Sequence, residues 1–207
     1  MGIRKRLALG VAGAALLAGT AGAVGGAESA WAGSPPVNGT GTLSCTGASG
    51  LLKFNPPLNF TGGSSETVGV KVTLTGCNAS GGNVTTPNFT GKGKGTISAS
   101  SNNCTNLAGQ QSVSGSVTIK WSGKAGKSKL NTSTLTLTQI TGTASGSNGN
   151  VGFTFSNQSL SGSFAGSTSG EVDSNQNASE AAAACNSKKG MKKLTLVAGS
   201  VSQAATA

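Results

Sequence analysis

The run Gly126-Lys127-Ser128, inside WSGKAGKSKL at residues 121–130, has the residue types that close a phosphate-binding nucleotide loop. Such a loop also needs a glycine at its first position and a following helix whose N-terminus faces the phosphates. Trp121 stands at that first position, and residues 131–141 alternate as a β strand does. The sequence therefore predicts no nucleotide site, but a glycine-rich hairpin loop that carries four lysines into solvent: Lys120, Lys124, Lys127 and Lys129.

Those four lysines are the candidate binding residues of the chain. Beside Trp121, they could contact an anionic polymer, an acidic glycan or a lipid headgroup layer. The competing interpretation is that they keep a β protein soluble and block edge-to-edge association of strands. Trp121 would then lie in the core, because it is two residues after Ile119 and so on the same face of the predicted strand. A second cluster allows the same two interpretations: Lys188, Lys189, Lys192 and Lys193.

The charge of residues 33–207 is positive and comes from lysine alone. Twelve lysines outnumber the four acidic residues, which gives a net charge of +8. Arginine, which these residues lack, is the side chain that forms two-pronged contacts with phosphates and bases, whereas lysine offers a hydrated point charge. This composition indicates loose attraction to anionic polymers and argues against a specific nucleic-acid site.

Hydrolytic chemistry has few side chains to use. The chain has no His and no Tyr, so a Ser-His-Asp or Cys-His arrangement cannot form. A carboxylate pair would have to combine Glu66 with Glu171, Asp173 or Glu180. The last three fall in a polar loop and at a helix cap, so we predict a protein that is not an enzyme. Without His or a C-x-x-C pair, we also predict no metal site and no cofactor.

Four cysteines, an even number, predict disulfides in an exported chain. They allow three pairings. We favour Cys45 with Cys77 and Cys104 with Cys185, because the first two close the ends of two strand-like segments around one excursion of the chain. Each bridge would restrict the unfolded chain and add about 2–4 kcal/mol of stability.

Period-two alternation of apolar residues predicts the β strands that position these groups. In residues 66–77 the Val and Leu side chains share one face, and Thr and Lys share the other. Similar rows recur at 41–46, 51–54, 95–100, 113–121, 131–141, 151–155, 159–164 and 193–200. About eight or nine short strands without long helices predict an all-β fold, either a single antiparallel β-sandwich or a partly closed barrel. Its core would contain the Val, Leu and Ile of these rows, all six Phe and Trp121.

Three local signals set boundaries within this pattern. Pro56-Pro57 predicts the end of the strand at 51–54, since proline cannot donate to a strand ladder. Asn148-Gly149 suits a tight hairpin turn, so the strands on either side of it should pair antiparallel. Residues 177–185 predict one short peripheral helix, with Asn177 as N-cap and Glu180 completing a capping box.

The first 32 residues have the three parts of a secretory signal peptide. They are the basic run Arg4-Lys5-Arg6, the apolar run 7–18 and the small-residue end Ala30-Trp31-Ala32. The alternative is an uncleaved membrane anchor, but the apolar run is shorter than the roughly 20 residues that span a bilayer. We predict cleavage after Ala32 and a single β domain at 33–207.

Two stretches resemble a group of small exported proteins of high-GC Gram-positive bacteria, the actinobacteria. They are GTLSCTGASGLLKFNPPL at 41–58 and SETVGVKVTLTGC at 65–77. The resemblance is strongest over 41–77, moderate through Trp121 and compositional beyond it. It implies an extracellular or cell-envelope location and adds support for the bridge between Cys45 and Cys77. The group has no assigned activity, so no functional residue carries over.

Together these features predict a secreted, disulfide-linked, non-enzymatic β domain that acts as a binding or structural module at the cell envelope or outside the cell. Its expected partners are anionic envelope polymers. One alternative is a small hydrolase that uses Glu66 with a second carboxylate, which an isolated, buried Glu66 in a cleft would favour. Another is an oligomeric β pore, because a strand with Val on one face and Thr and Lys on the other could lie between lipid and water.

Overall fold

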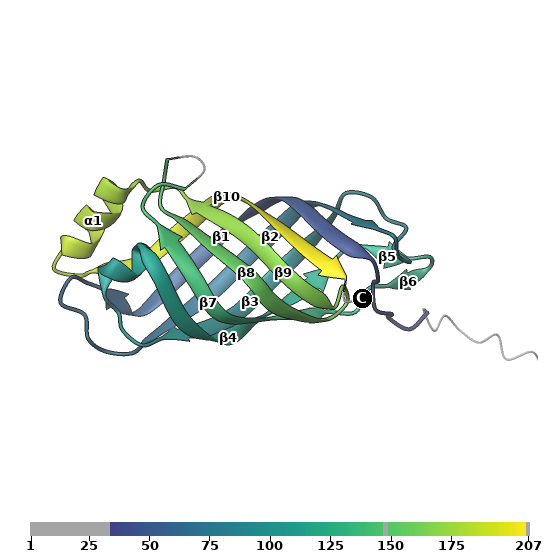
Figure 1. The fold of residues 1–207 in the computed structure, drawn as a ribbon, viewed down its shortest axis with the longest axis horizontal. Coiled ribbons are helices and arrows are strands. Elements are labelled where there is room, and N and C mark those ends of the chain that lie inside the picture. Colours follow the sequence, from purple (N-terminus) through teal and green to yellow (C-terminus); the bar gives the residue numbers. More distant parts are fainter. Residues whose placement is uncertain (1–33, 147–148, 206–207) are drawn as a thin grey trace, which may run out of the picture. The chain divides into compact units, whose positions relative to one another are not determined.

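Eight antiparallel strands close into a barrel in the order β1-β10-β9-β8-β7-β4-β3-β2 (Figure 1). The computed structural model describes residues 34–146 and 149–205, and the predicted signal peptide lies outside them. The elements are β1 (Thr42–Leu58), β2 (Glu66–Ser80), β3 (Phe89–Ala99), η1 (Cys104–Leu107), β4 (Gly109–Trp121), β5 (Lys124–Ala125), β6 (Ser128–Lys129), β7 (Ser133–Thr143), β8 (Gly152–Gly162), β9 (Gly166–Ser174), α1 (Ala178–Asn186) and β10 (Met191–Ala205). The all-β prediction is confirmed, and the barrel is fully closed.

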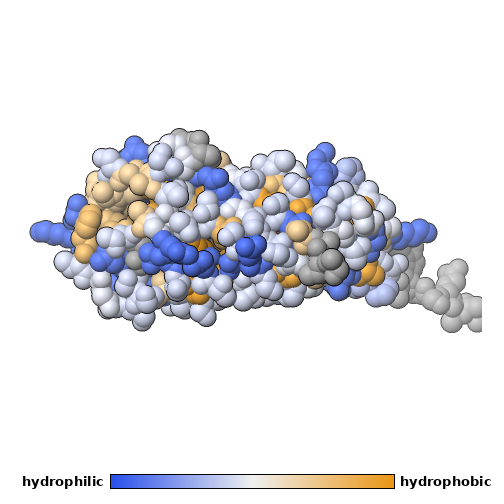
Figure 2. Space-filling model, in the orientation of Figure 1, coloured by the Kyte–Doolittle hydropathy of each residue, from blue (hydrophilic) through white to orange (hydrophobic). Residues whose placement is uncertain are grey.

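Alternation along each strand places apolar side chains inside the barrel and Thr, Ser and Lys outside. The stretch GKGKG in β3 shows this clearly, because buried Gly91 and Gly93 alternate with exposed Lys92 and Lys94. A Cβ at Gly93 would lie only 2.5 Å from Cγ1 of Val72 on β2, so the inner face of β3 has no room for a side chain there. The face visible in Figure 2 is mostly hydrophilic, with hydrophobic residues in small patches and around α1.

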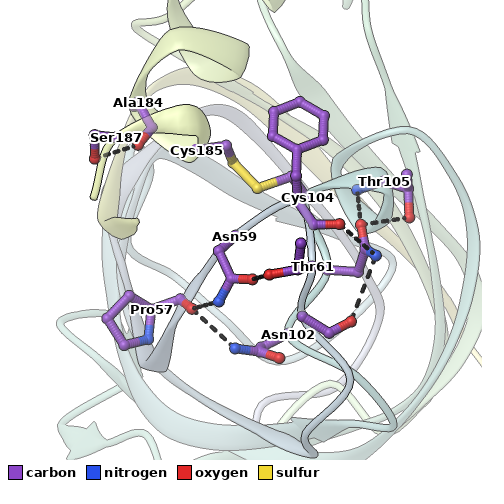
Figure 3. Close-up of a disulfide and its surroundings, with 12 residues drawn as sticks. Pro57, Asn59, Thr61, Asn102, Cys104, Thr105, Ala184, Cys185 and Ser187 are labelled. Carbon is purple, nitrogen blue, oxygen red and sulfur yellow. Dashed lines mark hydrogen bonds between the residues drawn. A yellow bond between two sulfur atoms is a disulfide. The ribbon is translucent and has the colours of Figure 1, made fainter. Parts of the chain in front are cut away.

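One end of the barrel is covered by η1, α1 and the loop between β1 and β2 (Figure 1). Asn102 holds this end together, because its amide donates to the Pro57 carbonyl at 3.0 Å and its Oδ1 accepts from the Ser64 N–H at 3.2 Å. A disulfide between Cys104 and Cys185 joins η1 to α1 (Figure 3). The predicted capping box of α1 is confirmed.

The opposite end is filled by aromatic rings. Trp121 packs edge-on against Phe89 and Phe164, with ring centroids 5.8 and 5.4 Å away. Its indole N–H donates to Oγ of Ser133 at 2.7 Å, so the buried ring has no unpaired polar atom. The segment before β1 crosses this end, where the Gly39 carbonyl accepts from the Phe164 N–H at 2.7 Å. The prediction that Trp121 lies in the core is confirmed.

Both predicted disulfides are present. Cys45 and Cys77 are direct partners on β1 and β2, and Cys104 bonds to Cys185 across the α1 end. The strands on either side of the predicted turn, β7 and β8, pair antiparallel as expected; Asn148 itself lies outside the described residues. Among the residues that the structure describes, no helix has the length and apolar character needed to cross a membrane.

Three predictions about local structure are wrong. β1 does not end before Pro56-Pro57 but continues to Leu58. The prolines fall where its register with β10 shifts and its pairing with β2 has ended at Asn55, so no ladder needs their missing N–H groups. Glu171 and Asp173 lie on a strand, β9, and not in a polar loop. Phe60 is 47% exposed on the loop after β1 and is not a core residue.

Candidate functional site

Six exposed lysines lie on one side of the barrel wall, on five neighbouring strands. We call this surface the lysine face; it comprises Lys193 on β10, Lys53 on β1, Lys71 on β2, Lys92 and Lys94 on β3, and Lys120 on β4. These strands are consecutive in the barrel. The alternation that buries the Val, Leu and Ile of each strand points these lysines outward.

The register of the sheet sets these lysines directly opposite one another. Lys71 is the cross-strand partner of Lys94, Lys92 is the partner of Lys120, and Lys53 is the partner of Lys193. Side chains at such positions have Cβ atoms about 4.5–5.5 Å apart, and like charges there destabilise a sheet. Three such pairs on one surface are therefore expected to reduce stability at low salt, where the charges are not screened.

No acidic side chain lies on the outside of these five strands to offset the charge. Glu66 on β2 is their only acidic residue, and its side chain is 3% exposed on the inner face. The other acidic residues of the described chain lie on β9 and α1: Glu171, Asp173 and Glu180. The charged side chains of the lysine face are therefore all positive.

A shallow groove of about 710 Å³ crosses the lysine face over β1, β2, β3 and β4. Four of the six lysines line it, together with three threonines, three glycines and two apolar residues: Lys71, Lys92, Lys94, Lys120, Thr73, Thr96, Thr118, Gly50, Gly93, Gly95, Leu51 and Val72. An extended chain would have room to lie along this groove with amines around it. The geometry suits a polymer better than a compact ligand.

Protection of sheet edges does not explain this lysine placement. Lysines on edge strands keep a sheet from pairing with another chain. All eight strands of this barrel have two neighbours, so none of them is an edge. For the lysine face, the competing interpretation therefore loses one of its two physical reasons, and solubility alone remains. Edge protection still applies to Lys124 and Lys129, because β5 and β6 form a two-stranded sheet.

The four lysines predicted as binding residues do not form one group. Lys120 belongs to the lysine face, opposite Lys92. Lys124 and Lys129 face each other across the β5–β6 hairpin, and Lys127 lies in its turn beside Gly126, which has φ of 60°. β7, not a helix, follows this hairpin, as expected for a loop that does not bind nucleotide.

Glu66, the residue on which the hydrolase alternative depends, is buried in an apolar environment. It lines a cavity of about 40 Å³ among residues of β1, β2, β3, β4, β7 and β8. Oε1 has no hydrogen-bond partner among the described residues, and burial raises the pKa of the Glu66 carboxyl to about 7. An isolated, buried Glu66 is what that alternative requires. The second carboxylate it requires is not among the residues that line this cavity.

Sequence reasoning named Glu66 but did not predict its burial, and it missed most of the lysine face. Glu66 has the same strand parity as Val68 and Val70, so the alternation that predicts β2 already carries the signal for its burial. Four lysines of the lysine face lie outside the predicted site, because their positions in sequence do not reveal which strands are neighbours: Lys53, Lys71, Lys92 and Lys94. In the described part of the chain, no group of three His, Cys, Asp or Glu side chains could hold a metal ion.

No protein-family model, no curated protein and no solved structure matches the chain. Its function therefore has to be argued from its own residues.

Proposed function

We propose that the chain is an exported, non-enzymatic binding module whose lysine face contacts anionic polymers at or outside the cell envelope. The observation that carries this proposal is the set of three lysine pairs across neighbouring strands on a surface without acidic residues. An anion between two such amines relieves their repulsion, so binding removes a strain that the free protein bears. The two disulfides, typical of oxidising compartments, support an extracellular location.

The partner that fits this surface is an extended polymer with repeated phosphate or carboxylate groups. The groove runs over four strands, so successive anionic groups could each meet a different lysine. Lysine contributes charge without the planar fork of arginine, so recognition should depend on charge density and little on covalent detail. Such binding weakens steeply with salt, because each neutralised charge releases a counterion.

The test is retention of the purified protein by isolated envelope material and by immobilised heparin as a defined polyanion, over a series of salt concentrations. If four charges are neutralised, affinity should fall on the order of 100-fold for a fourfold rise in salt, at charge densities like that of DNA. Replacing Lys71, Lys92 and Lys94 with Gln should remove most of the binding and flatten the salt dependence.

The matched control is the hairpin variant Lys124→Gln/Lys127→Gln/Lys129→Gln, which lowers the net charge by the same amount. We expect it to bind nearly as well as the wild type. Equal losses in the two variants would mean that net charge alone matters, and a larger loss in the hairpin variant would move the site to the end of the barrel. No retention at any salt concentration would overturn the proposal.

The alternatives have less support. A carboxylate-pair hydrolase needs two carboxylates at one cleft, and Glu66 is the only carboxylate that lines its cavity. A lipid-spanning barrel carries its apolar residues on the outside, whereas exposed Thr67, Lys71 and Thr75 alternate with buried Val68, Val70 and Leu74 on β2.

A further inference from the structure

The barrel interior contains an apolar cavity of about 110 Å³. Residues from all eight barrel strands line it, among them Leu52, Val72, Ile97, Trp121, Leu135 and Phe153. Protein interiors are close-packed, with few voids larger than a water molecule, and an apolar cavity of this size stays dry. A void enclosed by this many large side chains is therefore a candidate binding site.

The Glu66 cavity adjoins this one and extends it toward α1. Leu52, Ile97, Ile140 and Phe153 line both spaces. Glu66 is the only titratable side chain among the residues that line either of them, and its buried Oε1 has no hydrogen-bond partner in the part of the chain that the structure describes. The interior is thus an apolar column with a carboxyl group at its α1 end.

A second buried polar atom without a partner lies in the main cavity. Oγ1 of Thr168 on β9 belongs to a side chain that is 2% exposed, and it has no hydrogen-bond partner within residues 34–146 and 149–205. Thr168 is two residues from the start of β9, at the aromatic end of the barrel, whereas Glu66 begins β2 at the opposite end. Buried polar groups are almost always hydrogen-bonded, so each of these two atoms, at opposite ends of the column, is a possible contact for a polar group of a ligand.

We infer that the barrel interior binds a small apolar molecule that carries one hydroxyl group, with the hydroxyl against Glu66. A hydroxyl both donates and accepts, so it can donate to Oε1 and accept from the carboxyl proton at once. A charged head would be disfavoured, because the residues around Glu66 are almost all apolar: Leu52, Phe54, Leu58, Val68, Ile97 and Phe153.

The two spaces set the size of the ligand. An engineered apolar cavity of about 150 Å³ binds benzene, and the volumes here are of that order. An aromatic or cyclic alcohol with a single ring would fill the column. A long-chain lipid would not fit without movement of the lining side chains.

Movement of one side chain, Leu107, would open a route to the column at the α1 end. Leu107 of η1 lines the Glu66 cavity on one side and a pocket of about 130 Å³ on the other. That second pocket lies between η1 and α1, and exposed Phe60 and Ala178 are at its margin. Displacement of Leu107 would connect the two, so entry needs no opening of the barrel wall.

The test compares phenol with benzene, which differ by the hydroxyl alone, by calorimetric titration of the full chain at a pH below about 7, where Glu66 carries its proton. We expect both to bind the wild type. Glu66→Met should lower the ratio of phenol to benzene affinity by about 2- to 10-fold, the value of one hydrogen bond. Glu66→Gln, which keeps a donor and an acceptor, should preserve most of that ratio.

Two further variants keep the test decisive. Thr168→Val is nearly isosteric, and a fall in the ratio in this variant alone would overturn the assignment of the hydroxyl to Glu66. Thr75→Ser changes only the outer face of β2, away from both cavities, and should leave both affinities unchanged. An unchanged ratio in a folded Glu66→Met variant would overturn recognition by Glu66, and no binding of either probe would overturn the interior site itself.

Discussion

Glu66 combines two properties that oppose each other, an ionisable head and an apolar, buried position. Its place at the start of β2 is set by the same alternation that turns Val68 and Val70 inward. Any of these inner positions would accept an apolar residue, so a carboxyl here reduces stability unless a partner is bound. Glu66 is thus more informative about function than the apolar inner residues of β2.

The first prediction is that Glu66 makes stability fall as pH rises. Burial raises the pKa of the folded carboxyl to about 7, whereas an unfolded Glu titrates near about 4.3. Between these values the folded state holds a proton that the unfolded state has lost, so the free energy of unfolding decreases with pH and levels off above about 7. The full loss is on the order of 3 kcal/mol.

Urea unfolding of the wild type and of Glu66→Gln, from acidic to mildly alkaline pH, measures this effect. The variant lacks the titration, so the difference between the two curves isolates Glu66 from every other group. The wild type should lose stability relative to Glu66→Gln across the acidic range. Parallel curves would show that water or a partner group stabilises the ionised carboxyl in the folded state.

The disulfide between Cys104 and Cys185 joins two short helices, η1 and α1, and not two barrel strands (Figure 3). It closes a sequence separation of 81 residues. We predict that Cys104→Ser/Cys185→Ser lowers the free energy of unfolding by about 2–5 kcal/mol. The barrel should persist, while α1 becomes the least protected element.

Amide hydrogen exchange measures this directly, by comparing α1 with β2 and β3 in the two proteins. The largest increase in exchange is expected in α1 and η1, with a smaller increase in β2 and β3 that reflects the lower free energy of unfolding. Faster entry of phenol should accompany it, because Leu107 lies in η1 next to this bridge. The matched control, Cys45→Ser/Cys77→Ser, removes a bridge between paired strands and should leave α1 protected. Equal loosening of all elements in the first variant would contradict the prediction.

Alternation predicts most strands because their inner residues are large and apolar, as in β2 and β4. It misses β9 because the inner positions of that strand include Thr168 and Gly170, which carry no apolar signal. It ends β1 too early because a bulge tolerates Pro56-Pro57, and a bulge depends on the neighbouring strands. The sequence thus shows the strand preference of each segment, but it does not show which strands pair with one another.

The candidate site shows the same limit at the scale of the whole molecule. Each lysine of the lysine face can be predicted as exposed from its own strand, but the pairs depend on strand order and register. Lys53 and Lys193 are opposite each other only because β10 closes the barrel against β1. No local pattern contains that closure.

We predict that the lysine face makes the protein more stable as salt is added. Lys53→Thr/Lys71→Thr/Lys92→Thr removes one member of each pair, so it should melt higher than the wild type at low salt, by about 2–4 °C if the three repulsions total about 1 kcal/mol. The gain should vanish at high salt, where the charges are screened. The same variant should bind heparin less well, so the substitutions that raise the melting temperature also weaken binding.

Thermal unfolding monitored by circular dichroism, at low and high salt, checks this prediction. Lys127→Thr/Lys188→Thr/Lys189→Thr has the same net charge but removes lysines from turns, outside the strand pairs. Its melting temperature should stay close to that of the wild type. Equal gains in the two variants would show that overall charge, and not the facing pairs, sets the repulsion.

Closure by β1 and β10 also governs how the chain can fold. Every other strand pair of the barrel joins barrel strands that are consecutive in the chain, with the β5–β6 hairpin inserted between β4 and β7. In the β1–β10 pair, the Leu43 N–H donates to Oε1 of Gln203, 160 residues away. Contacts between such distant residues slow folding, because the entropy of closing a long loop is lost before the contacts form. Until β10 arrives, β1 and β9 are two open edges able to pair with another chain. A chain that ends before Met191 would therefore be a seed for aggregation and not a smaller barrel.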